Sequence, residues 1–600
     1  MKELTESQEV NQRYFWYIVN KKRNRSRTTS PIINDQGQMI TDVAEIRKEW
    51  NNYYQNLYTA TNNVERDGFH CHVMKQLEHV DKLPNAGNTL EDGSLEKDEV
   101  TQEMSKLKNR KAPGWDMITA EYLKHGGDIF KSTITWTLNV IIQREHVPQH
   151  FKRGLIVPIP KPDKDSCVKG NKRGITLLPV LYKILEKLIM QREAEWLQNS
   201  QVVDDVQGAG KIKCSSLHTS MLLQEVIAEN RTKGETVYVA LLDIKKAFDT
   251  VWIQGMLYKL LQLGLRMKPW RLIRDSYLNY ECAAYIGGQA APWFIAERGV
   301  HQGAPLSMPL YQVFINDLIQ QLRNSSYAAQ VGGMSIGSPS FADDISVVSL
   351  HKPGLNRMLA QCAEHSLKWR YEFSTEKCLA MIWGRDKWPE LPIRLGNEEM
   401  QVVKEGRHMG ITLTPGKRDH VYTERIGKGK AILMAACGIG NAQVPVPQTT
   451  LSKIYWNMCV PRMTYGLEVV PTSERQILEL EQAHRQHAKI IQGVPNNIHR
   501  PAPLATLGWM TMAGYVALIK IMFLFRMLCL PEENLYRNLT LTVLMKCIRQ
   551  GASHFRKLSP IADMYWYACK YKLEHIIETG MDTGWFGCVH DVKKRVKTVI

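Results

Sequence analysis

The spacing of hydrophobic residues changes along this chain and predicts two kinds of structure. Between about residues 110 and 415, short apolar runs alternate with stretches of helical periodicity, which is typical of an α+β domain. After residue 415 the pattern becomes mostly helical. Buried strands are predicted at 155–159 and 237–242, a tight hairpin at 341–349, and helices at 180–190, 221–228 and 309–322.

The residues before this region are more polar. Val100, Met104 and Leu107 share one helical face, so a helix is predicted over 95–107. Residues 61–95 contain clusters of Asn, Gly and Asp, which indicate a linker. The basic run Lys21–Arg27 is consistent with a phosphate-backbone contact, a nuclear import signal or a solvated helix end.

The most hydrophobic stretch of the chain runs from Met510 to Leu530. It contains Lys520 and Arg526, and a charge inside a bilayer is costly. A buried amphipathic helix is therefore predicted rather than a membrane span, and no membrane partner is expected. The first residues contain no apolar segment of the kind found in secretory signals, so the protein is not expected to be secreted.

The charge balance favours a polyanionic partner. Hydrophobic residues make up 44% of the 600 and charged residues 23%, which is typical of a folded globular protein. The net charge is +17, and residues 401–600 alone hold 26 basic and 14 acidic side chains. This surplus favours nucleic acid as a partner, although an ordinary basic protein would show the same balance.

Several chemistries are excluded by missing motifs. The twelve cysteines are scattered and form no Cys-x-x-Cys pair, which argues against a disulfide framework and against a zinc finger. A P-loop, a His-Glu-x-x-His motif and a Gly-x-Ser-x-Gly motif are also absent. These absences exclude most nucleotide hydrolases, zinc proteases and serine esterases.

Three aspartates carry the strongest chemical signal. Asp243 ends the buried strand 237–242, where an unpaired charge costs several kcal/mol. Asp343 and Asp344 are adjacent at the tip of the predicted hairpin, and a divalent cation would relieve their repulsion. If the two strands are neighbours, the carboxylates converge and can hold two Mg²⁺ ions about 3.5–4 Å apart for in-line phosphoryl displacement. Each motif alone is common in solvated turns, so the signal lies in the combination.

Further motifs resemble, in the same order, the reverse transcriptase of non-LTR (LINE-type) retrotransposons. Lys111-Ala-Pro-Gly-Trp-Asp116 resembles the opening K-A-P-G-x-D, and the fingers segment is matched by Ile156–Lys161 followed by Arg173–Leu178. The motifs L-D-x-K-K-A-F-D, G-V-R-Q-G-D-P-L-S and F-A-D-D are matched by Leu242–Asp249, Gly299–Ser307 and Phe341–Asp344. Two later motifs are matched by Thr375–Lys377 and Met409–Ile411, and residues 30–60 resemble the region upstream of the polymerase.

The resemblance implies an α+β right-hand polymerase fold. It would consist of fingers, a palm whose antiparallel sheet carries the three aspartates, a helical thumb and a mostly helical C-terminal region. The corresponding divisions are 1–95 for an N-terminal helical region and linker, 96–415 for fingers and palm (core about 140–415), 416–500 for the thumb and 501–600 for basic C-terminal helices.

The implied activity is that of an RNA-directed DNA polymerase. It would transfer nucleotides from dNTPs to a primer 3′-hydroxyl on an RNA template, in target-primed reverse transcription. The implied partners are the RNA template, a DNA primer or nicked target DNA, and dNTPs. The implied cofactors are two Mg²⁺ ions, with Mn²⁺ as a substitute. We expect synthesis in the cytoplasm and function in the nucleus. Because no nuclease is recognisable, a fragment or a truncated copy of the element's polyprotein is expected.

The resemblance also assigns the catalytic residues. Asp243, Asp343 and Asp344 would be the metal ligands, with the backbone carbonyl of Ile244 as an additional ligand. Lys377 would be the general acid that protonates the leaving pyrophosphate, although a surface lysine on a turn fits the sequence equally well.

Five residues are assigned to the nucleotide. Lys161 and Arg173 would bind the triphosphate, and Gln302 and Gly303 would contact the nucleotide or template. Phe248, expected in the first helical turn after Asp243, would exclude a 2′-hydroxyl. The alternatives are a pair of surface cations for Lys161 and Arg173 and a core residue for Phe248.

Four departures from the family pattern stand beside these matches. His301 replaces the usual Arg or Lys, Ala304 replaces the Asp of Q-G-D-P-L-S, Arg407–Met409 replaces an aromatic-Leu pair, and Gln207–Gly210 lacks an expected Phe. None of them removes a metal ligand. They leave open the alternative of a catalytically weak or inactive retrotransposon-derived protein that binds RNA.

Overall fold

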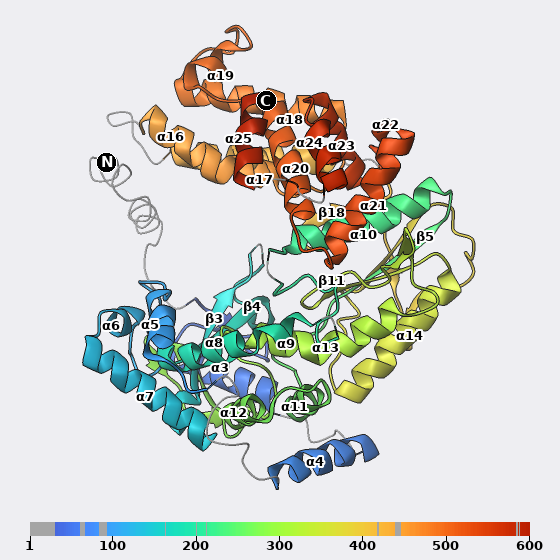
Figure 1. Cartoon of the computed structure of the whole chain (residues 1–600). Coiled ribbons are helices and arrows are strands. Elements are labelled where there is room, and N and C mark those ends of the chain that lie inside the picture. The colour runs from blue at the N-terminus through green and yellow to red at the C-terminus, as the bar shows by residue number, and fades with distance from the viewer. Residues whose placement is uncertain are drawn as a thin grey trace.

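Two sheets and a group of C-terminal helices organise the chain (Figure 1). The computed structural model describes residues 30–59, 67–82, 93–162, 164–199, 201–211, 213–416, 419–438, 446–583, 586 and 589–599. The basic run Lys21–Arg27 lies outside the described residues.

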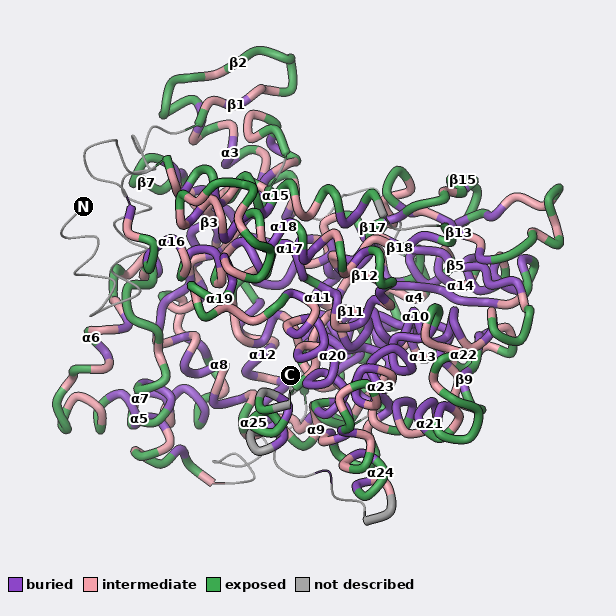
Figure 2. The backbone as a smooth tube through the Cα atoms, turned by 90° about the horizontal axis from the view of Figure 1, so that it is seen from above, coloured by how far each residue is buried: buried purple, intermediate pink, exposed green. Residues whose placement is uncertain are grey.

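The first sheet contains the predicted strand 237–242 and both strands of the predicted hairpin. Its strand order is β11 (Ser340–Phe341), β12 (Asp344–Ser349), β5 (Val237–Leu242), β13 (Leu379–Trp383) and β16 (Gln401–Val402). The middle strand β5 is antiparallel to both β12 and β13, and all six of its residues are buried (Figure 2). A strand with helices or strands on every side is apolar throughout, which is the pattern that the sequence shows. The predicted strand and hairpin are confirmed.

Two helices pack against this sheet. Helix α14 (Lys352–Trp369) contacts β5, β12 and also α13 (Ser307–Arg323), whereas α10 (Ser216–Thr232) contacts β5 and β11. The helices predicted at 221–228 and 309–322 are confirmed as parts of α10 and α13. Most of α10 is buried because α23 (Pro560–Lys570) packs on it as well.

The second sheet carries the other half of the candidate site. Its order is β4 (Lys172–Leu177), β3 (Arg153–Pro160), β6 (Glu281–Ile286) and β7 (Gln289–Ala290), and β8 (Phe294–Ile295) also pairs with β6. Strand β3 is confirmed but longer than predicted, and its last two residues are exposed. Helix α3 (Val43–Tyr58) packs on β6 through its apolar face, which includes Trp50, Tyr54 and Tyr58.

The linker predicted for residues 61–95 is wrong for part of its length. Helix α4 (Gly68–Asp81) begins at an N-cap in which the Asp67 carboxylate accepts from the His70 N–H. Val73 and Leu77 are buried, and α4 packs on α11 (Ile253–Gln262). The polar composition concealed a helix whose few apolar residues lie at i and i+4.

The remaining elements before residue 415 are short or peripheral. They are β1 (Ile32–Ile33), β2 (Met39–Ile40), α5 (Lys97–Ser105), α6 (Ala120–Lys124), α7 (Asp128–Arg144), η1 (Gln149–Phe151), η2 (Lys169–Asn171), α8 (Val180–Arg192), α9 (Ala194–Gln198), α12 (Met267–Tyr277), β9 (Gln330–Val331), β10 (Met334–Ser335), β14 (Arg394–Leu395), β15 (Glu398–Glu399), β17 (Gly406–His408) and β18 (Ile411–Leu413). The helices predicted over 95–107 and 180–190 are confirmed by α5 and α8.

The chain after residue 415 is helical, as predicted. Its elements are α15 (Asp419–Cys437), α16 (Gln448–Ile454), the π-helix η3 (Tyr455–Cys459), α17 (Val460–Thr464), α18 (Glu474–Gln492), α19 (Ala502–Leu507), α20 (Met512–Leu528), α21 (Leu535–Gln550), α22 (Ala552–Phe555), α23, α24 (Glu574–Thr583) and α25 (Val589–Val599). Helices α15 to α18 share a hydrophobic core of their own around Tyr455 and Leu480, whereas α21 to α25 join the core of the preceding domain. Helix α20 contributes to both cores. In Figure 1 the helices after residue 415 gather above the first sheet.

The apolar segment 510–530 forms α20, as expected for a buried helix. Among the described residues, no helix combines the length and the apolar character needed to cross a bilayer. The Lys520 ammonium is fully buried and lies 2.8 Å from Asp563 Oδ2, and it donates to the Val470 carbonyl at 2.7 Å. Asp563 also accepts from Arg556 at 3.0 Å. A buried charge is tolerated here because each partner is paired.

This buried cluster gives a stability prediction. Asp563→Asn removes the carboxylate that pairs with both Lys520 and Arg556 and should lower the free energy of unfolding by about 3–5 kcal/mol. Lys520→Met should cost less, because Asp563 keeps Arg556 as its partner. Urea unfolding of both variants measures the difference. Equal losses, or a smaller loss for Asp563→Asn, would contradict the assigned charge balance.

Candidate active site

The register of the first sheet brings the predicted aspartates together. Strands β5 and β12 are antiparallel neighbours in which Leu242 pairs with Ile345. The next position outward therefore places Asp243 opposite Asp344, at the same end of the sheet. Asp343 occupies the two-residue turn of the β11–β12 hairpin, where Phe341 pairs with Asp344. The expectation that the two strands are neighbours is confirmed.

The three carboxylates oppose one another's ionisation. Burial raises the pKa of Asp344 to about 7, and the charges of Asp343 and Asp243 add to the effect. Burial also raises the pKa of Asp343, and the charge of Asp243 contributes, whereas Arg173 and Lys377 act in the opposite direction. Such a group of partly buried carboxylates needs positive charge from side chains or metal ions.

Lys377 supplies one of these charges. Its Nζ lies 2.7 Å from Asp243 Oδ2. The loop that carries it is tied to the end of β5, because the Ser374 N–H donates to the Asp243 carbonyl at 2.7 Å. Ile244 and Phe373 lie opposite each other in an isolated β-bridge, whose hydrogen bonds are made by the main-chain groups of the residues on either side of them. The Ile244 carbonyl therefore takes no part in these bonds.

The predicted phosphate-binding cations come from the hairpin of β3 and β4. Arg173 pairs with Ile159 across the two strands, and the Lys161 N–H donates to the Asn171 carbonyl at 2.9 Å. Burial lowers the pKa of the Lys161 ammonium, and the nearby charges of Lys246, Lys377 and Arg173 lower it further. Cations from the second sheet therefore approach the carboxylates of the first sheet.

Phe248 lies in a series of turns and not in a helical turn. Lys246 adopts a φ of +51°, which interrupts any helix after Asp243, and α11 begins only at Ile253. The half-buried Phe248 ring stacks on Tyr311 with ring centroids 4.7 Å apart. Burial and the charges of Asp343, Asp344 and Asp243 raise the pKa of Tyr311, so this tyrosine lies beside the carboxylates.

Gln302 and Gly303 lie in a loop fixed to β4. The Thr176 N–H donates to the Gln302 carbonyl at 2.8 Å. Gly303 has a φ of +118°, and a Cβ there would lie 3.1 Å from the Thr176 carbonyl oxygen, so a side chain is disfavoured. The Gln302 side-chain amide donates to Asp249 Oδ1 at 2.7 Å.

Asp249 and Tyr58 form a support for Gln302 that sequence reasoning missed. The Tyr58 hydroxyl donates to the same Asp249 oxygen at 2.8 Å. Asp249 is 3% exposed, and burial raises its pKa to about 6, against the lowering effects of Tyr58, Lys246 and Gln302. The sequence did contain a signal for Asp249, because this residue belongs to the matched motif Leu242–Asp249. For Tyr58 the only sequence signal was its place on the apolar face of α3.

Two of the departures from the family pattern are buried histidines. His301 is 4% exposed, its ring lies 4.3 Å from that of Tyr277 and 3.9 Å from that of Tyr280, and burial lowers its pKa to about 3. It is therefore a neutral packing residue and supplies no positive charge. His408 Nε2 lies 2.8 Å from the Ser346 hydroxyl and joins the β17–β18 hairpin to β12.

The donor set fits Mg²⁺, although it is small. Among the residues that the structure describes, no group of three or more His, Cys, Asp or Glu side chains is arranged to hold a metal ion by itself. Mg²⁺ is commonly held by only one or two carboxylates together with substrate phosphates and water. Asp243 and Asp343, at the same end of the first sheet, match that requirement.

Asp249 yields a pH prediction with a defined sign. Its folded-state pKa, about 6, is above the value of 3.8 for an unperturbed Asp, so ionisation opposes folding. This effect is absent below about pH 4 and develops as the pH rises through about 6.

Asp249→Asn keeps an oxygen for both Tyr58 and Gln302 but carries no charge. It should be more stable than the wild type by about 1–3 kcal/mol at pH 8 and nearly equal at pH 4, as measured by urea unfolding. A difference between the two proteins that stays constant from pH 4 to pH 8 would contradict the prediction.

Comparisons with known proteins agree with this geometry. Residues 159–413 match the family model described as reverse transcriptase (RNA-dependent DNA polymerase). The RNA-directed DNA polymerase from mobile element jockey of Drosophila funebris is 27% identical over 393 residues, which cover 63% of this chain and 42% of that protein. The transposon TX1 uncharacterized 149 kDa protein of Xenopus laevis is 24% identical over 484 residues, or 78% and 36% of the two chains.

A third relative comes from another kind of element. The retrovirus-related Pol polyprotein from type-1 retrotransposable element R2 of Nasonia vitripennis is 26% identical over 270 residues, which cover 44% of this chain and 26% of that protein. The chain thus spans less than half the length of these three relatives. Residues 159–413 are thus similar to reverse transcriptases, and the chain is similar to proteins named as RNA-directed DNA polymerases or Pol polyproteins of mobile elements.

Proposed function

We propose that this chain is an RNA-directed DNA polymerase that extends a primer 3′-hydroxyl with dNTPs on an RNA template, in target-primed reverse transcription. The observation that carries the proposal is the register of β5 and β12, which aligns Asp243 with the Asp343–Asp344 turn inside a reverse transcriptase domain. In this proposal the first sheet would be the palm, the β3–β4 hairpin would belong to the fingers, and α15 to α18 would be the thumb.

The carboxylates repel one another, and bound metal ions would relieve this repulsion. Two Mg²⁺ ions bound by Asp243 and Asp343, with the Ile244 carbonyl, would lower the pKa of the primer 3′-hydroxyl and neutralise the triphosphate. Asp344, opposite Asp243 in the register, would add negative charge to the same site. Lys377, in contact with Asp243, is placed to give a proton to the leaving pyrophosphate.

The remaining side chains would position the nucleotide. Lys161 and Arg173 approach the carboxylates from the second sheet and would hold the triphosphate oxygens. Gln302, fixed by Asp249, would contact the nucleotide or the template. Phe248, stacked on Tyr311 beside the carboxylates, would meet the sugar at C2′.

Nucleic acid would lie across the basic C-terminal half. Lys430, Lys453 and Arg462 are exposed on α15 to α17. Cations on a helical surface bind phosphate backbones without sequence preference. A nicked DNA target as a further partner, and action in the nucleus, are also part of this proposal.

The direct test is primer extension on an RNA template with purified protein. The wild type should extend a DNA primer with dNTPs when Mg²⁺ is present, and chelation should abolish the product. Asp343→Asn should lower kcat by at least about 100-fold, since it removes a metal ligand. RNA binding without extension by the wild type would overturn the proposal and favour an inactive RNA-binding descendant.

Phe248 gives a prediction about sugar selection. Phe248→Val opens space beside C2′ and should raise the ratio of kcat/KM for NTP over dNTP about tenfold or more. Tyr311→Phe keeps the stacked rings and serves as the matched control, with an unchanged ratio. An unchanged ratio in a folded Phe248→Val variant would show that Phe248 is a packing residue only.

A further inference from the structure

The turn that carries Asp343 has a backbone conformation that its sequence does not favour. Ala342, the residue before Asp343, has a φ of +57°. An alanine there meets the steric penalty of the left-handed region, which glycine or asparagine would avoid. Because Asp343 directly follows Ala342, the direction of its carboxylate depends on whatever holds this conformation.

The side chain of Gln207 makes the contacts that hold it. Its Oε1 accepts from the Ala342 N–H at 2.8 Å, and its Nε2 donates to the Ala342 carbonyl at 3.1 Å. Gln207 is 0% exposed. One amide group thus pairs with both main-chain groups of the strained residue, as a neighbouring strand would.

The main chain around Gln207 continues this pairing along β11. The Ser340 N–H donates to the Val206 carbonyl at 3.0 Å, and the Gly208 N–H donates to the Ser340 carbonyl at 2.9 Å. Residues 206–208 therefore lie beside β11 as an additional short strand, and the Gln207 amide extends the pairing to the turn, where strand pairing ends.

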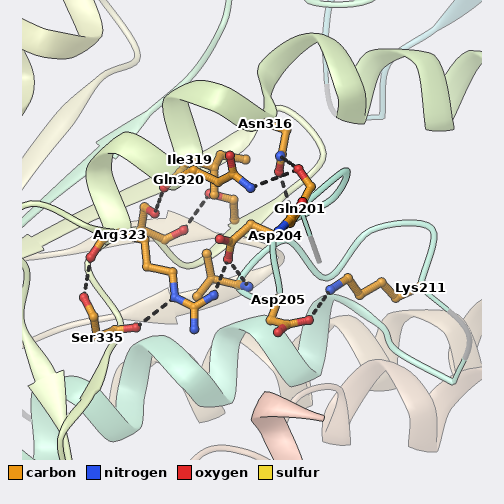
Figure 3. Close-up of polar contacts among 12 residues, drawn as sticks. Gln201, Asp204, Asp205, Lys211, Asn316, Ile319, Gln320, Arg323 and Ser335 are labelled. Atoms are coloured by element: carbon orange, nitrogen blue, oxygen red, sulfur yellow. Dashed lines mark hydrogen bonds and ion pairs between the residues drawn. The ribbon is translucent and has the colours of Figure 1, made fainter. Parts of the chain in front are cut away.

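Helix α13 fixes this segment through one face (Figure 3). Arg323 lies 2.8 Å from Asp204 Oδ1, and the Asn316 side-chain oxygen accepts from the Asp204 N–H at 2.7 Å. The same Asp204 carboxylate accepts from the Val206 N–H at 3.0 Å. On the same face of α13, Gln312 donates to the Ala209 carbonyl. The contacts cover the segment on both sides of Gln207.

From these contacts we propose that Gln207 is a positioning residue for catalysis, which locks Ala342 in its left-handed conformation and thereby aims the Asp343 carboxylate at its metal ion. The proposal rests on the proposed polymerase function. Gln207 has its side chain directed at the hairpin backbone and is not a catalytic residue. Sequence comparison drew attention to the segment 207–210 only for a missing Phe.

The first test uses Gln207→Met, which has nearly the same size but loses both bonds to Ala342 and the bond that Oε1 accepts from the Ala209 N–H at 3.2 Å. It should lower kcat about tenfold to a hundredfold with little change in KM for dNTP, because a small displacement of a reacting group costs that much. It should also raise the Mg²⁺ concentration needed for half-maximal activity. The matched control is Asp205→Asn, which breaks a surface ion pair with Lys211 in the same segment and should leave both values unchanged.

The second test asks whether Gln207 affects catalysis through the backbone conformation of Ala342. Ala342→Gly removes the Cβ penalty at positive φ, so it should restore part of kcat when added to Gln207→Met. A purely structural role would give no such rescue. No gain from glycine, together with a kcat for Gln207→Met within twofold of that for Asp205→Asn, would overturn the proposal.

Amide hydrogen exchange tests whether Gln207 holds the turn at Ala342, and this measurement does not depend on enzymatic activity. A peptide spanning 340–346 should exchange faster in Gln207→Met than in wild type or Asp205→Asn, and unchanged exchange would overturn the proposal. A wild-type protein that extends no primer would contradict the proposed function, whereas the exchange experiment would still decide whether Gln207 holds the turn.

Discussion

The repulsion among three carboxylates at one end of a buried sheet governs the structure around the candidate site. Strand β5 is buried on all sides, so Asp243 emerges from an apolar core, and the β12 register puts Asp344 opposite it. Burial and mutual charge raise the pKa of Asp343 and Asp344. Lys377 on Asp243, and Lys161 and Arg173 from the other sheet, provide positive charge around the same point.

This charge cluster needs a rigid support, and the support comes from distant parts of the chain. Gln207 reaches the turn at Ala342 across 135 residues of sequence, and Tyr58 reaches Asp249 across 191. Tyr58 belongs to α3, which precedes the segment 159–413 that matches the reverse transcriptase family. The upstream helix is therefore part of the packing beneath the Gln302 loop and not a separate appendage.

The sequence predicted the parts of the site that local patterns encode. The sequence itself shows a continuous apolar run that ends at Asp243. It also shows a hairpin pattern with two adjacent acidic residues at its tip. The supporting residues were not predictable in this way, because a glutamine that pairs with a turn 135 residues away has no local signature. Phe248 was expected in a helical turn, and the positive φ of Lys246 replaces that helix with a series of turns. Helix α4 was missed because its buried residues are few among many polar ones.

In the proposed function, Asp243 and Asp343 would together hold two divalent ions beside a bound nucleotide. Electron paramagnetic resonance with Mn²⁺ counts those ions directly, using the full chain with an RNA–DNA primer-template and a non-hydrolysable dNTP. We expect two tightly bound ions per wild-type chain and at most one in Asp343→Asn. Equal stoichiometry in the two proteins, or no tight binding to the wild type, would contradict it.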